Sequence, residues 1–242
     1  MKLRPYEKVA VIYDAMMKKL DYESWSNYIL EIADEYIDEK AIVLELGAGS
    51  CKIAGYISAK YKNYYATDIS LSMLKSSGNI DLPKICCDMT ELPLKTKFDF
   101  IFSNFDGVNY ILKQKNLFRL FKEVFHLLER DGVFTFDVSL ESNSLNFVIS
   151  KSVEGRSNGY SFRRVSQYNK LSRIHSNHFY IRDESGMEFK EVHKEKIYKI
   201  DTYFNLAEKA GFHTEACYNC FTFKDVNSKS ERAQFILRKI NS

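Results

Sequence analysis

The sequence feature that most constrains the fold is the run AIVLELGAGSC at residues 41–51. It opens with an apolar, β-rich segment that predicts a buried strand. Gly47 and Gly49 then allow the backbone to turn tightly and to approach a ligand closely. Residues 51–60 can continue as a helix whose free N–H groups point back at the loop. Strand, glycine turn and helix, in this order, open a nucleotide-binding α/β sheet.

Two residues indicate which nucleotide this turn would bind. A dinucleotide fingerprint has a third glycine at position 52, where this chain has Lys52. Glu45 lies two residues before Gly47, at the mouth of the strand, where a carboxylate would repel a pyrophosphate and attract an ammonium or a sulfonium. S-Adenosylmethionine carries both cationic groups. The alternative is a generic strand–loop–helix turn with no ligand.

The segment ELGAGSC at residues 45–51 resembles the first motif of class I S-adenosylmethionine-dependent methyltransferases, roughly E/D-x-G-x-G-x-G. Cys51 stands where that motif has its last glycine, and a residue entering a helix should need no positive φ. The resemblance implies a Rossmann-like α/β fold with a mostly parallel, seven-stranded sheet. It also implies cofactor contacts from Glu45, Gly47, Ala48 and Gly49.

Size, charge and cysteine content exclude several classes. The chain has 242 residues, enough for one large α/β domain with an insertion, and its net charge of +3 is too small to argue for nucleic-acid or membrane binding. No apolar run approaches a membrane span and no signal-peptide core follows the N-terminus, so we expect a cytoplasmic protein. Five cysteines argue against a disulfide framework, and Cys217-x-x-Cys220 lacks the second pair of a zinc site.

The N-terminal residues predict two helices, at 5–20 and 22–38, with Asp21 as the N-cap of the second. The segments YDAMM at 13–17 and YESWSNY at 22–28 resemble the N-terminal signature of a group of small bacterial methyltransferases. That resemblance implies that these helices cap the cofactor, with contacts from Tyr13, at its methionine end, and from Trp25. The alternative is an aromatic stripe packed on the sheet.

Two acidic residues follow the next predicted strands. Asp68 ends the strand at 64–67, at about the 20-residue spacing of a carboxylate that accepts both ribose hydroxyls. It could instead cap the helix that starts near Ser70. Ile69 could pack on the adenine. The segment DMTELP at 88–93 resembles the family's D-x-x-x-L-P, which implies adenine contacts from Asp88 and from the backbone of Met89; a surface turn is the alternative.

The segment NFDGVNY at 104–110 leaves the next strand at its carboxyl end, where ligands bind in open α/β sheets. It resembles the family's loop that lines the methyl-transfer site. The resemblance implies that Asn104 lies near the transferred methyl group and that Asp106 is a catalytic candidate, for binding or deprotonating an acceptor. Each residue could instead be a turn-former or a cap.

The βα alternation stops after the fifth strand. Alternating segments at 160–168, 174–182 and 187–200 predict an antiparallel β insertion at 141–200, interrupting a cofactor-binding domain of 1–140 and 201–242. We expect it to cover the acceptor site. Glu191-Val192-His193 resembles an E-x-H element of the same bacterial group, which makes His193 the second catalytic candidate. A solvent-facing histidine on an exposed strand is the alternative.

These features together predict methyl transfer from S-adenosylmethionine to a small-molecule nitrogen or oxygen nucleophile, with S-adenosylhomocysteine as the product. The reaction is an in-line displacement that requires a general base only if the acceptor must lose a proton. Two alternatives stay open. One is an RNA or protein methyltransferase with a basic patch of Arg163, Arg164, Lys170 and Arg173; the other is a nonenzymatic S-adenosylmethionine-binding protein.

Overall fold

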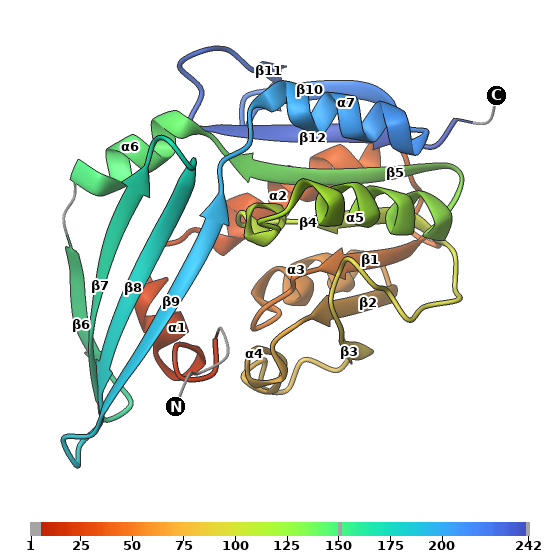
Figure 1. Cartoon of the computed structure of the whole chain (residues 1–242). Coiled ribbons are helices and arrows are strands. Elements are labelled where there is room, and N and C mark those ends of the chain that lie inside the picture. The colour runs from red at the N-terminus through yellow and green to blue at the C-terminus, as the bar shows by residue number, and fades with distance from the viewer. Residues whose placement is uncertain (1–5, 150–151, 241–242) are drawn as a thin grey trace.

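The computed structural model describes residues 6–149 and 152–240. Its main feature is a central sheet of eight strands in the order β11-β10-β12-β5-β4-β1-β2-β3 (Figure 1). The strands are β1 Ile42–Leu46, β2 Asn63–Asp68, β3 Lys84–Cys86, β4 Phe98–Ser103, β5 Leu128–Ser139, β10 His213–Asn219, β11 Lys224–Asp225 and β12 Arg232–Arg238. The helices are α1 Ala10–Met16, α2 Tyr22–Asp34, α3 Lys52–Lys60, α4 Leu71–Lys75, α5 Gln114–Leu127, α6 Glu141–Ile149 and α7 Ile200–Ala210, with a 3-10 turn η1 at Gly107–Tyr110.

The expected mostly parallel α/β sheet is confirmed. Strands β1 to β5 pair in parallel, β12 pairs antiparallel with β5, and β10 pairs antiparallel with β12. The eighth strand, which the sequence did not predict, is the two-residue edge strand β11. Strand β1 lies between β2 and β4, so the glycine loop that follows it emerges at the middle of the carboxyl edge. Parallel strands buried on both faces explain the continuous apolar runs of β1 and β4.

Helices cover both faces of this sheet. Helices α5 and α7 pack on one face, where Leu120 and Tyr203 meet Phe136 and Phe235. Helices α2 and α3 pack on the other face and bury their apolar stripes against β1, β2 and β4. Asp21 caps α2 as predicted, since its Oδ1 accepts the Ser24 N–H at 2.9 Å. None of the helices in the described parts of the chain is long and apolar enough to cross a membrane.

The insertion is a second, four-stranded antiparallel sheet in the order β6-β7-β8-β9. Its strands are β6 Ser152–Ser157, β7 Tyr160–Asn169, β8 Ile174–Arg182 and β9 Glu188–Lys196. The three alternating segments are therefore confirmed as strands, whereas β6 and α6 were not predicted. Figure 1 shows this sheet beside the carboxyl edge of the main sheet, with α1 against it.

The first helix differs most from its prediction. It spans only Ala10–Met16 of the predicted 5–20, and position 5 lies outside the described residues. Its buried residue Ile12 and the N-cap residue Val9 pack against Phe162, Phe179 and Ile181 of the insertion sheet. The N-terminal segment therefore gains its stability from the insertion, because seven residues are too few for a stable isolated helix.

Candidate cofactor and methyl-transfer site

A cavity of about 420 Å³ opens at the carboxyl ends of β1, β2 and β4. Ten of the predicted cofactor-binding residues line it: Tyr13, Glu45, Gly47, Ala48, Gly49, Asp68, Ile69, Asp88, Met89 and Asn104. Tyr6, Phe105 and Tyr110 line it too and were not predicted as site residues. The structure therefore brings residues from the N-terminal segment, three strand ends and the loop after β4 into one site.

The glycine loop has the left-handed backbone that its sequence predicts at Gly47 (φ +73°) and Gly49 (φ +56°). The Ala48 N–H donates to the Thr67 carbonyl at 2.8 Å and holds the loop against β2. Cys51 also has a positive φ of 57°, so the expectation of an ordinary backbone at that position was wrong. A non-glycine residue in this conformation costs roughly 1–2 kcal/mol, which the packing of the fully buried Cys51 side chain must offset.

Asp68 ties the glycine loop to the end of β2. Its Oδ2 accepts the Gly49 N–H at 2.8 Å, and its Oδ1 accepts the Ser70 N–H at 2.7 Å. The N-cap of α4 is Ser70, not Asp68. Burial raises the pKa of Asp68, although these two hydrogen bonds act in the opposite direction. A carboxylate has about four acceptor positions, so each oxygen can accept a further hydroxyl from the cavity.

Glu45 is a buried carboxyl group at the end of β1, with 2% of its surface exposed. The Tyr64 hydroxyl donates to its Oε2 at 2.6 Å. Burial raises the pKa of Glu45 to about 7, and the charge of Asp68 adds to this effect against the Tyr64 hydrogen bond. A cation in the cavity would favour the ionised form.

We therefore expect the affinity for S-adenosylmethionine to increase with pH below neutrality. Its ammonium group should lower the pKa of Glu45 from about 7, so binding should release a proton. Between pH 5.5 and 7.5 the Kd should fall by roughly tenfold. Titration calorimetry in two buffers of different ionisation enthalpy measures both quantities. Glu45→Gln should show neither effect, and a wild-type Kd that is constant over this range would contradict the assignment.

Asn104 indicates that the cavity is built for a polar ligand. Only 3% of its surface is exposed. Neither its Oδ1 nor its Nδ2 has a hydrogen-bond partner among the described residues. An unpaired buried amide costs about 1–3 kcal/mol. Asn104 lines the cavity, so a ligand there is the nearest source of partners for an amide whose atoms are otherwise covered.

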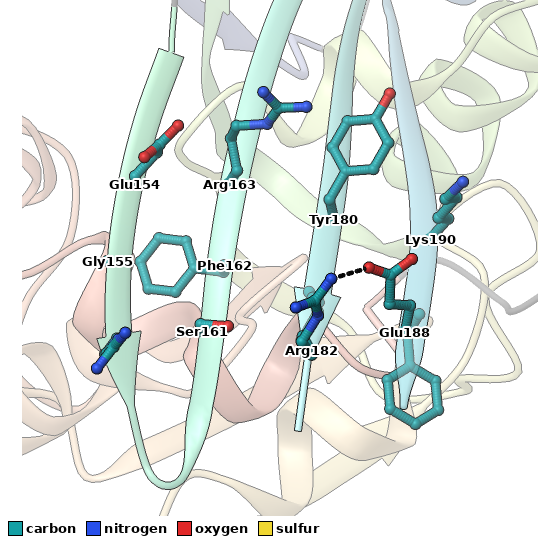
Figure 2. Close-up of a pocket in the computed structure, with 12 residues that line it drawn as sticks. Glu154, Gly155, Ser161, Phe162, Arg163, Tyr180, Arg182, Glu188 and Lys190 are labelled. Atoms are coloured by element: carbon teal, nitrogen blue, oxygen red, sulfur yellow. Dashed lines mark hydrogen bonds and ion pairs between the residues drawn. The ribbon is translucent and has the colours of Figure 1, made fainter. Parts of the chain in front are cut away.

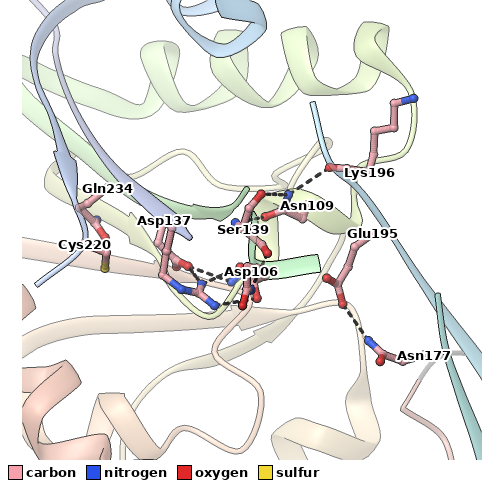
Figure 3. Close-up of polar contacts among 11 residues, drawn as sticks. Asp106, Asn109, Asp137, Ser139, Asn177, Glu195, Lys196, Cys220 and Gln234 are labelled. Carbon is pink, nitrogen blue, oxygen red and sulfur yellow. Dashed lines mark hydrogen bonds and ion pairs between the residues drawn. The ribbon is translucent and has the colours of Figure 1, made fainter. Parts of the chain in front are cut away.

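Asp106 is held in an ion-pair network (Figure 3). Arg232 donates to both of its carboxylate oxygens, at 2.6 and 3.0 Å, and also to Oδ2 of Asp137. The Asp106 N–H donates to the same Asp137 oxygen at 3.2 Å. Both carboxylate oxygens of Asp106 are thus engaged by Arg232, and Asp106 does not line the cavity. The network instead fixes the turn in which Phe105 (φ 57°) and Asp106 (φ 63°) are both left-handed.

Trp25 does not line the cavity, which corrects its prediction as a direct cofactor contact. Its ring is buried and lies 4.5 Å, between centroids, from the ring of Phe105, which does line the cavity. The resemblance pointed to a helix that covers the cofactor. The left-handed turn at Phe105, which the sequence did not show, places another aromatic ring in between.

His193 is buried, so the alternative of a solvent-facing histidine is wrong. It does not line the cavity itself but packs on Tyr6, with 4.3 Å between ring centroids, and its Nδ1 lies 3.4 Å from the Tyr110 hydroxyl. Its Nε2 lies 3.0 Å from Oε2 of Glu191. Glu191 Oε1 accepts the N–H groups of Lys8 and Val9 at 2.5 and 3.1 Å. This pair therefore fastens the N-terminal segment that carries Tyr6 and Tyr13 over the cavity.

The comparisons with known proteins identify the class of protein. A family model described as a methyltransferase domain matches residues 44–136. YqeM of Bacillus subtilis (strain 168), provisionally named a methyltransferase, is 25% identical over 97% of both chains. The crystal structure of an S-adenosylmethionine-dependent methyltransferase from Clostridium acetobutylicum ATCC 824 superposes with a TM-score of 0.80 and 25% identity, over 98% of this chain and 100% of that one. The sugar N-methyltransferase KedS8 from Streptoalloteichus sp ATCC 53650 shares the fold, with a TM-score of 0.75 and 15% identity over 95% and 93% of the two chains.

The fold is thus the Rossmann-like methyltransferase fold, with a mostly parallel sheet and antiparallel finishing strands. Within that class, the chain is an S-adenosylmethionine-dependent methyltransferase, and its cofactor is S-adenosylmethionine. The residues around the cavity fit this cofactor, because they offer a carboxylate at Asp68 for a diol, a carboxyl group at Glu45 for a cation and an unpaired amide at Asn104.

Proposed function

We propose that the protein transfers the methyl group of S-adenosylmethionine to a nitrogen or oxygen atom of a small molecule that enters between the loop after β4 and the insertion sheet. The observation that carries this proposal is the unpaired amide of Asn104 on the cavity wall. Tyr6 and Tyr13 of the N-terminal segment line the cavity, and the insertion packs against that segment. Such a covered site suits a compact acceptor better than a folded macromolecule.

In this proposal the cofactor supplies an electrophilic methyl group on a positive sulfur. Asp68 accepts the ribose hydroxyls, Ile69 and Asp88 flank the adenine, and Glu45 faces the methionine end. Tyr13 and Asn104 lie towards the reacting methyl group. Since the electrophile is already activated, the chain mainly positions the acceptor in line and excludes water. The acceptor lone pair forms the new bond while the sulfur takes the electrons of the old one.

The distribution of basic residues does not favour a macromolecular acceptor. Arg163 lies on the outer face of the insertion sheet, in a hollow of about 740 Å³ with Tyr180, Arg182 and Glu188 (Figure 2). Arg164 is on the opposite face by strand alternation. Arg173 forms an ion pair with Glu141 at 2.9 Å. The four residues of the predicted basic patch therefore do not form one surface, and the outer hollow faces away from the cofactor cavity.

Label transfer tests the acceptor class. The protein is incubated with S-adenosylmethionine that carries a tritiated methyl group. Separate RNA, protein and small-molecule fractions, from cells that naturally make the protein, are offered as acceptors. We expect label in the small-molecule fraction only. Label that appears instead in RNA or protein would overturn the proposal. The control is Asn104→Ala, which should lose the transfer of label if the methylation is enzymatic and not spontaneous.

A further inference from the structure

Glu195 is a buried carboxyl group that neither the cofactor site nor the predicted motifs include. It lies on β9, two residues beyond His193, so strand alternation places Glu191, His193 and Glu195 on the same inner face of the insertion sheet. Only 9% of its surface is exposed. Buried glutamates are rare unless they are paired, so the partners of Glu195 need an explanation.

The partners within the described residues leave Glu195 incompletely satisfied. The Asn177 amide donates to its Oε1 at 3.3 Å, and Asn177 is itself held by Ser166 at 2.6 Å. Oε2 has no hydrogen-bond partner, and the carboxylate has no ion pair, among the residues that the structure describes. Figure 3 shows the Glu195 side chain extending from β9 towards the loop of Asp106, with Asn177 on its other side.

Two guanidinium groups, those of Arg232 and Arg164, act on Glu195, but neither forms an ion pair with it among the described residues. The nearby guanidinium of Arg232 is already bound by Asp106 and Asp137. Burial raises the pKa of Glu195 to about 8, and repulsion by Asp106 is the next contribution, against smaller opposing effects of Arg232 and Arg164. A cation placed between Glu195 and Asp106 would relieve this repulsion.

A second observation connects this carboxyl group to the reaction site. The unpaired amide of Asn104, 3% exposed, lines the cofactor cavity two residues before Asp106. Tyr110 also lines the cavity, and its pKa is raised by burial, then by Tyr6, and then by the charge of Glu195. Polar groups thus continue from the methyl end of the cavity to Glu195.

We propose that Glu195 binds the amino group of the methyl acceptor, which is a small molecule bearing a primary or secondary amine. This inference rests on the proposed small-molecule methyl transfer and specifies its acceptor chemistry. A carboxylate matches an ammonium in charge and in hydrogen bonding, and a bound ammonium would hold Glu195 in the ionised form that burial otherwise disfavours. An alcohol would not.

Glu195 also accounts for the proton that an amine must lose. The acceptor R–NH3⁺ gives one proton to the Glu195 carboxylate and becomes R–NH2, whose lone pair is free. That lone pair forms the N–C bond while the C–S bond breaks and its electrons stay on sulfur. The products are R–NH2⁺–CH3 and S-adenosylhomocysteine, and the Glu195 proton then leaves to solvent.

The test uses the small-molecule fraction of the producing cells, divided in two. One half is treated with an acylating reagent that blocks amines and leaves alcohols free. We expect wild-type protein to label the untreated half and not the acylated half. Glu195→Gln should lower kcat/KM by about 100-fold or more. Because Glu195 lies outside the cofactor cavity, the Kd of this variant for S-adenosylmethionine should stay within about twofold of the wild-type value. Glu188→Gln, on the exposed face of the same strand, is the matched control and should behave as wild type.

Two outcomes would overturn the inference alone. One is equal labelling of the acylated half, which identifies an alcohol acceptor, and the other is wild-type turnover by a folded Glu195→Gln. If the wild-type protein labels neither half but labels RNA or protein, the proposed small-molecule function is wrong and this inference falls with it.

Discussion

Asp68→Ala should weaken binding of S-adenosylmethionine by roughly 100-fold. Hydrogen bonds to a charged group contribute about 1.5–3 kcal/mol each, and the two free acceptor positions of Asp68 match the two hydroxyls of a ribose. A loss of about 3 kcal/mol corresponds to roughly 100-fold in Kd. Isothermal titration calorimetry with S-adenosylhomocysteine and S-adenosylmethionine measures this loss, with Asp81→Ala as a control at an exposed aspartate.

Asp68 also holds Gly49 and Ser70, so its removal can loosen the glycine loop as well as remove a ligand contact. A ligand-side comparison separates the two effects. Wild-type protein should bind S-adenosylhomocysteine much more tightly than an analogue whose ribose lacks the 2′-hydroxyl, whereas Asp68→Ala should bind the two within about twofold of each other. Equal discrimination by both proteins would show that Asp68 acts only on the loop.

The cofactor half of the site could be predicted because its signals are local. The strand–glycine–helix run, the spacing to Asp68 and the segment after β3 each depend on residues close together in the chain. Parallel strands then bring their carboxyl ends to one edge without further information. Gly47, Asp68 and Asp88 accordingly line one cavity.

The remaining parts of the site depend on contacts between distant residues, which no local pattern reveals. Arg232 meets Asp106 across 126 positions, and Lys8 meets Glu191 across 183. Phe105 has a left-handed backbone although it is neither glycine nor asparagine, so its own residue type does not predict this conformation. Its ring lies between Trp25 and the cavity. The E-x-H pair was recognisable, but its contact with the N-terminal segment required the insertion sheet to be placed.

The insertion shows the same limit. Alternation in β7, β8 and β9 predicted strands, and it also identified which residues share a face. It predicted an antiparallel insertion, but it did not show that β9 packs against the turn η1 after β4. His193 was assigned a role through the E-x-H element, whereas Glu195 on the same face was not, because its position opposite the turn after β4 depends on how the two sheets pack.

Arg232→Met should destabilise the protein by about 3–5 kcal/mol, because it leaves two carboxylates without their guanidinium in a buried place. Asp137 is fully buried and Asp106 is one-fifth exposed at its side chain. For a domain of this size the loss corresponds to a fall in Tm of roughly 10 °C. The matched control is Arg238→Met on the same strand, whose partner Glu215 is 3.7 Å away and partly exposed. That pair should contribute less than about 1 kcal/mol.

The loss should depend on pH in a defined direction. Burial raises the pKa of Asp137 to about 6 in the folded protein, against the charge of Arg232, from an ordinary value of 3.8. A raised folded-state pKa favours folding below the unfolded value and loses this contribution as the pH increases through 6. Without Arg232 that pKa increases further. Arg232→Met should therefore lose more stability at pH 8 than at pH 5, as thermal unfolding at the two pH values will show.

A neutral replacement of the whole network distinguishes charge from packing. In the triple variant Asp106→Asn, Asp137→Asn, Arg232→Gln no buried charge is left unpaired, so most of the lost stability should return. Affinity for S-adenosylmethionine should return less completely, because the bidentate contact that fixes the left-handed turn at Phe105 and Asp106 is absent. A triple variant as unstable as Arg232→Met would show that the guanidinium acts through packing on Trp25, over whose ring it lies at 5.3 Å, and not through its charge.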